Sequence, residues 1–468
     1  MASEAPDRTP RVSPDVERRL LATFQDVVAS MPWYRALLEE AGVDAAHVRT
    51  ARDFARLPRL TKHNTFERFG VRALAATTPL ASLASVLTSS GHGGRFSFGL
   101  TTREMEAAGA EAIDAALDDA FAVRSRATLA INCLPMGVTF GSRCMTVATT
   151  SVREDMAAAL VDAFGPEFAQ VLLVADPLFL KRLLDHARER QLDWHRHRVQ
   201  VVVGEEVFGE HFRAYVSRRL GLSPDREDGT WLMSSMGVGE LGLHLFHETR
   251  ATVALRRLAA ADREFAHDLL SAAGNRHGLP MCFTYADRRI HVEIDRPDEE
   301  GFGRLLVSML DPALPVPLLR YETGDMARLL EPDAVRAIVE RHGARLPGPL
   351  PDRLVLLRGR EREALANGSH VTVYKDAVYA DDATADALTG AVRLTFDDGR
   401  VTMHVQRARD GGPGDDESIA DALREAIPPA ARPAAIEVWP YERFPFGMTL
   451  DYERKFVSYA APAAEART

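Results

Sequence analysis

Three short apolar runs in the first half of the chain have the length and continuity of buried β-strands. They span residues 127–135, 170–176 and 199–206. Between the last two runs, residues 177–190 place apolar side chains at helical spacing and charged side chains on the opposite face. This order of strand, helix and strand predicts a βαβ unit. We therefore expect a parallel sheet whose ligands gather at the carboxyl ends of its strands.

The second half of the chain has a different pattern, in which turns separate the strands. Residues 289–295 and 303–310 are strand-like runs on either side of a turn, which predicts an antiparallel pair. Residues 392–396 and 401–405 flank the turn Asp397-Asp398-Gly399, which is typical of a β-hairpin. A loop, a helix and a strand are then expected at residues 409–416, 417–427 and 436–439, respectively.

These patterns together predict an α/β protein with two domains. A large N-terminal domain with parallel sheets and helices is expected over residues 1–358, and a small C-terminal α+β domain over residues 359–468. The chain length of 468 residues agrees with this division, because a single hydrophobic core stops growing below that size.

Charge and composition narrow the range of partners. The formal net charge of −10 is spread along the chain without a basic block, so we expect neither nucleic acid nor an anionic membrane as a partner. Small molecules are the expected partners. The start of the chain is polar, and no apolar run reaches the roughly 20 residues that span a bilayer, which predicts a cytoplasmic protein. Three cysteines without a C-x-x-C pair are typical of a reducing compartment.

Residues 86–98, VLTSSGHGGRFSF, form a candidate phosphate-binding segment. Glycines let backbone N–H groups approach an anion, hydroxyls donate hydrogen bonds, and an arginine supplies positive charge. The residues concerned are Ser89, Ser90, Gly91, His92, Gly93, Gly94 and Arg95. The segment is neither a Walker loop nor a G-x-G-x-x-G fingerprint, and the alternative is a solvated turn.

Two carboxylates stand in turns that could serve a nucleotide. Glu240, in SSMGVGELGL, could hold Mg²⁺ beside a triphosphate, because hard cations take oxygen ligands. Asp325, at the end of LRYETGD, could accept hydrogen bonds from ribose hydroxyls. The alternatives are a solvated surface glutamate and an aspartate that favours the turn for backbone reasons alone.

Three further segments have candidate roles. The run RLVLLRGR ends in Gly359-Arg360 where the composition shifts, which is also typical of an interdomain linker. Residues 134–140, LPMGVTF, could line a pocket for an acid through Met136 and Phe140, or could pack in the core. Residues 443–456 contain Lys455, which could equally be a solvated surface lysine.

A zinc site can be assembled on paper from His244, His247, Glu248 and Cys282. The histidine spacing is not that of H-E-x-x-H, and a lone distant thiol is more often a core residue. We therefore do not expect zinc.

Taken in order, these segments resemble the adenylate-forming superfamily, and within it the phenylacetate-coenzyme A ligase-like branch. The opening Trp33-Tyr34-Arg35 and the run from Asp53 to Lys62 are similar to that branch's start. The later matches are Val203-Gly204-Glu205 to "GaE", Met236-Gly237-Val238-Gly239-Glu240 to "YGxTE", Arg320-Tyr321-Glu322-Thr323-Gly324-Asp325 to "RYrTGD", and Gly359-Arg360 to the "GR" hinge.

The resemblance implies ATP-dependent activation of a carboxylic acid as its acyl-adenylate, with release of pyrophosphate, and then transfer to a thiol such as coenzyme A. It implies that residues 89–95 wrap the β- and γ-phosphates, that Glu240 binds Mg²⁺, and that Lys455 bridges the acid and the α-phosphate. Arg95 would neutralise phosphate charge, Asp325 would bind ribose, and the small domain would rotate about residues 360–362 between the two half-reactions. The resemblance also implies that Gly204, Glu205, Met236, Gly237 and Arg360 bind the nucleotide. It implies that His92, Met136, Phe140 and Gly239 line the acid pocket.

Departures from the family pattern leave the acceptor open. His92-Gly93 replaces two threonines and Arg95 replaces lysine in the phosphate segment, and Met236 replaces the aromatic residue that stacks on adenine. Beyond Arg360 the Asp-Asp hinge pair is missing. The acceptor could therefore be coenzyme A, a carrier protein, an amine or another nucleophile. The non-enzymatic alternative is a catalytically inactive scaffold that binds a nucleotide. A homodimer is also left open.

Overall fold

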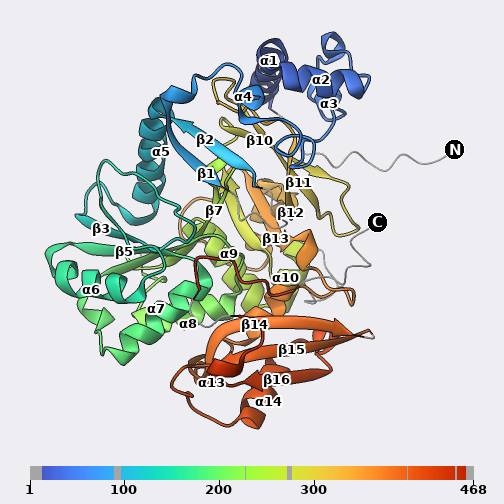
Figure 1. Cartoon of the computed structure of the whole chain (residues 1–468). Helices are drawn as coiled ribbons and strands as arrows, with labels where there is room; N and C mark the ends of the chain where they lie inside the picture. Colours follow the sequence, from blue (N-terminus) through green and yellow to red (C-terminus); the bar gives the residue numbers. More distant parts are fainter. Residues whose placement is uncertain are drawn as a thin grey trace.

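The computed structural model describes residues 13–88, 96–226, 228–270, 277–397, 399–447 and 451–459. The chain begins with a group of helices at one end of the molecule (Figure 1). These are α1 (Pro14–Ser30), α2 (Pro32–Glu40), α3 (Ala51–Phe54) and α4 (Val71–Leu74). Two strands that pair antiparallel follow them, β1 (Leu83–Thr88) and β2 (Phe98–Thr102).

A mixed sheet of eleven strands forms the body of the molecule, in the order β10-β11-β12-β13-β9-β8-β7-β6-β5-β3-β4. One half is parallel and consists of β3 (Thr128–Asn132), β4 (Thr146–Thr149), β5 (Gln170–Ala175), β6 (Val199–Val203) and β7 (Leu232–Val238). The other half is antiparallel and consists of β8 (Gly242–His247), β9 (Met281–Tyr285), β10 (Ile290–Asp295), β11 (Gly303–Met309), β12 (Tyr321–Leu330) and β13 (Leu354–Arg360). The predicted parallel strands and the predicted antiparallel pair are thus both present.

Strands β3, β5 and β6 are buried at every residue because both faces of this part of the sheet are covered. All six residues of β5 are buried, and alternate residues enter different clusters. Val171 and Leu173 pack into the main core, whereas Leu172 and Val174 pack on the opposite face with Phe121. This is the arrangement that a continuous apolar run predicts for a strand in a parallel sheet.

Helices connect the parallel strands and cover the sheet. They are α5 (Arg103–Phe121), α6 (Glu154–Phe164), α7 (Pro177–Glu189) and α8 (Glu210–Leu220), and α9 (Arg250–Ala261), α10 (Arg263–Leu270) and α11 (Pro332–Arg341) belong to the later part of the chain. The predicted helix at residues 177–190 is α7. It begins where Asp176 caps the amides of Leu178 and Phe179 at 2.9 and 3.0 Å and Pro177 supplies a preset φ.

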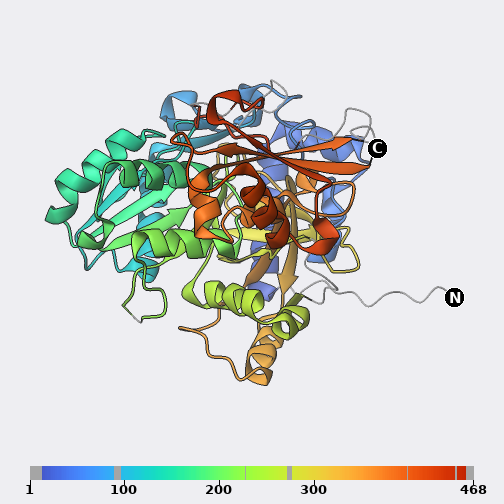
Figure 2. The same ribbon diagram turned by 90° about the horizontal axis from the view of Figure 1, so that it is seen from below.

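The last part of the chain forms a second, three-stranded sheet with its own helices (Figure 1). Its elements are α12 (Val371–Ala377), α13 (Asp382–Ala387), β14 (Leu388–Asp397), β15 (Arg400–Arg407), α14 (Asp416–Ala426) and β16 (Ala435–Trp439). Strands β14 and β15 form the predicted antiparallel hairpin, and β16 pairs parallel to β15. Seen from below, this sheet lies over the large sheet (Figure 2).

The two parts of the molecule are in close contact. Buried residues of the small sheet, such as Val392 and Met403, belong to the same hydrophobic cluster as the strands of the large sheet. Strand β13 ends at Arg360, so the predicted boundary between residues 358 and 359 lies inside this strand of the large sheet. Within the described ranges, no helix is both long enough and apolar enough to cross a membrane.

Candidate active site

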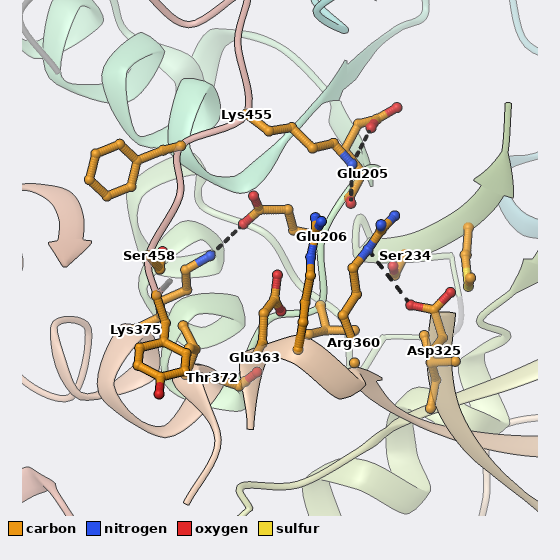
Figure 3. Close-up of a pocket in the computed structure, with 18 of the residues that line it drawn as sticks. Glu205, Glu206, Ser234, Asp325, Arg360, Glu363, Thr372, Lys375, Lys455 and Ser458 are labelled. Atoms are coloured by element: carbon orange, nitrogen blue, oxygen red, sulfur yellow. Dashed lines mark hydrogen bonds and ion pairs between the residues drawn. The ribbon is translucent and has the colours of Figure 1, made fainter. Parts of the chain in front are cut away.

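Two cavities meet where the parallel strands end and the small sheet covers the large one. The first, which we call the charged cavity, has a volume of about 300 Å³ (Figure 3). Its charged lining residues are Glu205, Glu206, Asp325, Arg360, Arg362, Glu363, Lys375 and Lys455. The second, which we call the apolar cavity, has a volume of about 170 Å³. Its apolar lining residues are Leu87, Ile113, Leu117, Leu134, Met136, Val138, Phe140, Val174, Val202, Met233, Val238 and Leu243.

Lys455 lies at the junction of the two cavities and lines both. Its Nζ is 2.8 Å from Oε2 of Glu205 and donates to the carbonyl oxygen of Glu205 at 3.1 Å (Figure 3). Glu205 follows β6 with a φ of 71°, a left-handed conformation that is uncommon for a residue other than glycine. A cation on the C-terminal segment is therefore held over the carboxyl end of the parallel sheet.

The segment that carries Lys455 is anchored on both sides of it. Glu453 accepts a hydrogen bond at 2.8 Å from the amide of Met136 and another at 2.5 Å from the hydroxyl of Ser151. The amide of Leu394 in β14 donates to the carbonyl of Ser458 at 2.7 Å. The two contacts of Glu453 connect residues 317 and 302 positions apart in the sequence, and the three contacts together determine where the ammonium group lies.

Glu240 is buried at the wall of the apolar cavity, and its side chain is 3% exposed. Its Oε1 accepts from Tyr321 at 2.9 Å and from Ser97, and it lies 3.5 Å from the Lys62 ammonium. The pKa of the Tyr321 phenol is raised, chiefly by burial and then by Glu240, so the phenol stays a donor.

A magnesium ion fits this carboxylate as a single protein ligand. Mg²⁺ binds to one or two carboxylates, completes its octahedron with water and substrate phosphate, and does not need a cage of protein groups. No cluster of three or more His, Cys, Asp or Glu side chains suitable for a metal occurs in the part of the chain that the structure describes.

Asp325 and Arg360 face each other across the antiparallel strands β12 and β13. The Arg360 Nε lies 4.0 Å from Oδ1 of Asp325 (Figure 3). Asp325 raises the pKa of the Arg360 guanidinium above its ordinary value, which burial opposes. The pair therefore places one fixed negative and one fixed positive charge on the floor of the charged cavity.

Buried charges also line the far side of the charged cavity. Lys375 of α12 lies 2.6 Å from Glu206 (Figure 3). Burial opposes ionisation of Glu206, but Lys375, together with Lys455 and Arg360, outweighs it, and the pKa of Glu206 is below its usual value. Burial raises the pKa of the neighbouring Glu363. None of Lys375, Glu206 and Glu363 was singled out in the sequence, because nothing local indicates that α12 packs beside β6.

Gly237 occupies a position where only glycine fits. A Cβ atom there would lie 2.9 Å from the carbonyl oxygen of Gly242 and 2.9 Å from Cα of Leu243. The close approach lets β7 and β8 turn back on each other, and Gly237 lines both cavities. The segment SSMGVGELGL thus forms a hairpin wall between the cavities.

The structure brings most of the residues predicted from the sequence to the two cavities. Those that line one or both are Met136, Phe140, Gly204, Glu205, Met236, Gly237, Gly239, Glu240, Asp325, Arg360 and Lys455. The predicted phosphate-segment residues Ser89, Ser90, Gly91, His92, Gly93, Gly94 and Arg95 lie outside the described residues. The flanking strands β1 and β2 are present, and Leu87 of β1 lines the apolar cavity.

Sequence reasoning did not single out Lys62, Ser97 and Tyr321 as parts of the site, although they surround Glu240. Lys62 and Tyr321 stand inside segments that carry the family resemblance, so a signal was present for them. Ser97 stands at the end of the glycine-rich segment and had no signal of its own.

The residues considered for the alternative zinc site make other contacts in the structure. The Glu248 carboxylate is 2.7 Å from the Arg213 guanidinium and 3.5 Å from Arg256, inside the protein. The imidazole of His244 contacts Ser235 at 2.9 Å and stacks on His247. The carboxylate of the proposed set is therefore part of a buried ion pair.

No protein-family model and no curated protein matches the chain. Solved structures do match. 2-Hydroxyisobutyryl-CoA ligase in the postadenylation state with 2-HIB-AMP matches with a TM-score of 0.68 and 14% identity, over 97% of this chain and 90% of that chain. The same enzyme with R3-HIB-AMP matches with a TM-score of 0.67 and 13% identity, over 99% and 95% of the two chains.

The enzyme in the thioesterification state, with 2-HIB-AMP and CoA, matches with a TM-score of 0.54 and 15% identity, over 98% of this chain and 93% of that chain. These likenesses extend over nearly the whole of both chains. They confirm the predicted fold class. The chain has the fold of 2-hydroxyisobutyryl-CoA ligase.

Proposed function

We propose that the chain is an ATP-dependent, adenylate-forming ligase. In this proposal it activates a hydrophobic carboxylic acid as its acyl-AMP, releases pyrophosphate and passes the acyl group to a thiol such as coenzyme A. The observation that carries the proposal is the position of Lys455 between a charged and an apolar cavity. Such a junction suits a reaction that joins a charged nucleotide to an apolar acid.

In the first step, a carboxylate oxygen of the acid attacks the α-phosphorus of ATP. The new P–O bond forms as the bond to the pyrophosphate oxygen breaks, and pyrophosphate leaves with the electron pair. The apolar cavity would hold the body of the acid, so that its carboxylate lies at the junction beside Lys455. The ammonium group would then neutralise charge on both reacting groups, and a fixed cation in a water-poor site is an effective stabiliser of such a transition state.

The charged cavity would hold the nucleoside part of ATP. Asp325 would accept from the ribose hydroxyls, Arg360 would lie near the phosphates, and Met236 would pack on adenine in place of an aromatic ring. The phosphate segment at residues 89–95, with Arg95, would receive the β- and γ-phosphates. Mg²⁺ on Glu240 would neutralise phosphate charge when it is bound.

Coenzyme A as acceptor is supported by the fold. The chain shares it with an enzyme that has been captured with 2-HIB-AMP and CoA, although the identity is low. Within the superfamily, we assign the chain to the phenylacetate-coenzyme A ligase-like branch on its ordered segments alone. That assignment also suggests an acid with an aromatic or otherwise hydrophobic body.

A second acceptor class is favoured by the segment after Arg360, which is tied to the large sheet's helices. Asp376 of α12 accepts from the Phe212 amide at the start of α8 at 3.0 Å. Asp382 of α13 lies 2.6 Å from Arg218. Rotation of the small domain about residues 360–362 would have to break these contacts. A carrier protein, amine or other nucleophile that attacks without such a rotation is therefore the alternative to coenzyme A.

The test of adenylation is acid-dependent exchange of ³²P-pyrophosphate into ATP across a panel of aromatic and aliphatic acids. We expect exchange with a subset of hydrophobic acids and none without acid. Absence of exchange with the whole panel would favour a nucleotide-binding scaffold. Product analysis with coenzyme A, holo-carrier proteins and amines then separates the acceptors. Asp382→Ala is expected to speed transfer to coenzyme A if rotation limits that step, and to leave pyrophosphate exchange unchanged.

A further inference from the structure

A tight turn in the connection between β3 and β4 forms part of the wall of the apolar cavity. Four residues of this connection line the cavity: Leu134, Met136, Val138 and Phe140. The amide of Val138 closes the turn by donating to the carbonyl of Pro135 at 3.2 Å. The two central residues, Met136 and Gly137, have φ angles of 59° and 67°. A left-handed conformation is unfavourable for methionine, and it persists only where surrounding contacts hold it.

Two buried side chains of the large sheet and its helices hold the ends of this connection. The side-chain amide of Asn132 donates to the carbonyl of Val138 at 2.9 Å. Asp114 of α5 accepts from the hydroxyl of Ser142 at 2.5 Å and from the amide of Arg143 at 2.7 Å. These contacts leave the middle of the turn to be held by another part of the chain.

The middle of the turn is held by the C-terminal segment, residues 451–459. The amide of Met136 donates to Oε2 of Glu453 at 2.8 Å, and Oε1 of the same carboxylate accepts from the Ser151 hydroxyl at 2.5 Å. Glu453 stands two positions before Lys455 in the sequence. One short segment therefore carries both the ammonium group at the junction of the cavities and the carboxylate that holds the wall of the apolar cavity.

We propose that Glu453 is a positioning residue that couples the shape of the acid-binding cavity to the placement of Lys455. With the C-terminal segment in place, Glu453 holds the strained turn at Met136. When the segment leaves, the turn loses this contact and the wall relaxes. Binding linkage is reciprocal, so an acid that fits the held wall stabilises the segment in place as much as the segment stabilises the bound acid. Acids whose body fits the cavity thus place Lys455 most completely.

This inference rests on the proposed function, because it requires that the apolar cavity binds the acid and that Lys455 acts in adenylation. The alternative is that Glu453 only holds Lys455. All acids present the same carboxylate to the ammonium group, so under this alternative the loss of Glu453 slows adenylation of every acid by the same factor. Under coupling, the loss of Glu453 also weakens discrimination between acids with different bodies. The ratio of kcat/KM values for two acids separates these cases.

The kinetic test measures pyrophosphate exchange with butyrate, hexanoate, benzoate and phenylacetate. Discrimination is the ratio of the highest to the lowest kcat/KM in this series. We expect Glu453→Ala to reduce the ratio about fivefold or more, since an apolar pocket of fixed shape discriminates a single methylene by about 10–200-fold. Ser151→Ala is the matched control, because it removes the other hydrogen bond of the carboxylate and leaves the bond to Met136. It should keep the ratio within about twofold of the wild type.

Amide hydrogen exchange tests the linkage independently of turnover. The acid with the highest kcat/KM, added with ATP, should slow exchange in the peptide covering residues 451–459 relative to ATP alone. Lys455→Ala should keep this slowing, whereas Glu453→Ala should lose most of it, because the coupling runs through the carboxylate and not through the ammonium group. Glu453→Gln can accept only one hydrogen bond through its amide oxygen in the same geometry, and it should give an intermediate result.

The Glu453 side chain is exposed, and Tm measurements check that its variants fold. If Glu453→Ala does not fold, the comparison of wild type, Glu453→Gln and Lys455→Ala decides the question. An unchanged ratio of kcat/KM values in the Glu453 variants overturns the inference, and so does slowing of exchange that persists in them undiminished. Absence of pyrophosphate exchange with every acid overturns the proposed function itself, and the two failures are therefore distinguishable.

Discussion

The charged cavity and the apolar cavity share a wall, but they are built from different parts of the molecule. The charged cavity lies between the two sheets, and four of its charged residues, Arg362, Glu363, Lys375 and Lys455, come from the chain beyond β13. The apolar cavity lies against the parallel half of the large sheet, and residues of α5, β5, β6 and β7 line it. The interface between the two sheets thus supplies most of the charged side chains, and the interior of the large domain supplies the apolar surface, although Lys62 and Glu240 also line the apolar cavity.

This difference has a physical reason. Val174 and Val202 are inward-facing residues of strands that are covered on both faces, so a gap beside them is lined by apolar side chains. Charged side chains are tolerated only where partners and water reach them, as at the ends of strands and between domains. A reaction that joins ATP to a hydrophobic acid needs both environments next to each other. Substitutions in each cavity test whether the two cavities act separately.

The largest effect is expected from Lys455, because it belongs to both cavities. Lys455→Ala should lower kcat for pyrophosphate exchange by about 10²–10³-fold, which is typical for loss of one group that stabilises the transition state. Lys455→Arg, which keeps the charge in a different geometry, should retain part of the rate. Far-UV circular dichroism and Tm check that both variants fold. An unchanged exchange rate in Lys455→Ala would remove the residue from the mechanism.

Substitution of Glu240 tests whether a residue in the wall of the apolar cavity contributes to nucleotide binding. Glu240→Gln should lower exchange by about 10–100-fold and raise the Mg²⁺ concentration required for half-maximal rate, because the amide oxygen is a weaker ligand than a carboxylate. The titration of rate against Mg²⁺ is the measurement. Tyr321→Phe is the control, since it removes one hydrogen bond to the same carboxylate and keeps its charge. Equal Mg²⁺ requirements in wild type and Glu240→Gln would contradict the metal role.

Paired variants test the separation of the cavities most directly. Asp325→Asn should raise KM for ATP about tenfold, in keeping with the loss of a hydrogen bond to a charged group, and should leave KM for the acid unchanged. Phe140→Ala should have the opposite pattern, because it enlarges the apolar cavity. Initial-rate kinetics with each substrate varied in turn give both constants. If each variant changes both KM values equally, the cavities are not separate sites.

The smallest effect concerns pH. Burial lowers the pKa of His244 to about 3, so its charge does not change between pH 6 and pH 8.

The lowered pKa of His244 also affects the free energy of unfolding. The unfolded chain takes up a proton at His244 below its ordinary pKa of about 6.5, whereas the native state does not do so until about pH 3. This contribution to stability is fully present above pH 6.5, and it is lost as the pH falls towards 3. In urea titrations, His244→Leu should therefore lose less stability than the wild type between pH 6.5 and pH 4.

Much of the fold could be predicted from local pattern. The runs that form β3, β5 and β6 were identified because a strand of a parallel sheet is buried on both faces and is therefore continuously apolar. The hairpin of β14 and β15 was identified from its turn and alternation. Glu240 and Asp325 were found because small residues and turns around a carboxylate leave a local signature.

Other features depended on contacts that no local pattern contains. Lys62 meets Glu240 across 178 positions, and Lys375 meets Glu206 across 169. The binding of Glu453 to Met136 and Ser151 places Lys455, and neither partner is close to it in sequence. His244 was considered only for a metal site, because its position in the wall of a cavity is a property of the packed hairpin.

The sequence by itself determined which segments are strands and helices, because apolar periodicity and turn residues act over a few positions. It also indicated that a nucleotide and an acid are the ligands to expect, through segments whose order resembles one superfamily. Only the tertiary structure decided that Lys455 stands between a charged cavity and a largely apolar one, and that His244 lies in the wall of the second. These are results of packing between distant segments, and they follow from the shape of the whole core rather than from any stretch of the chain.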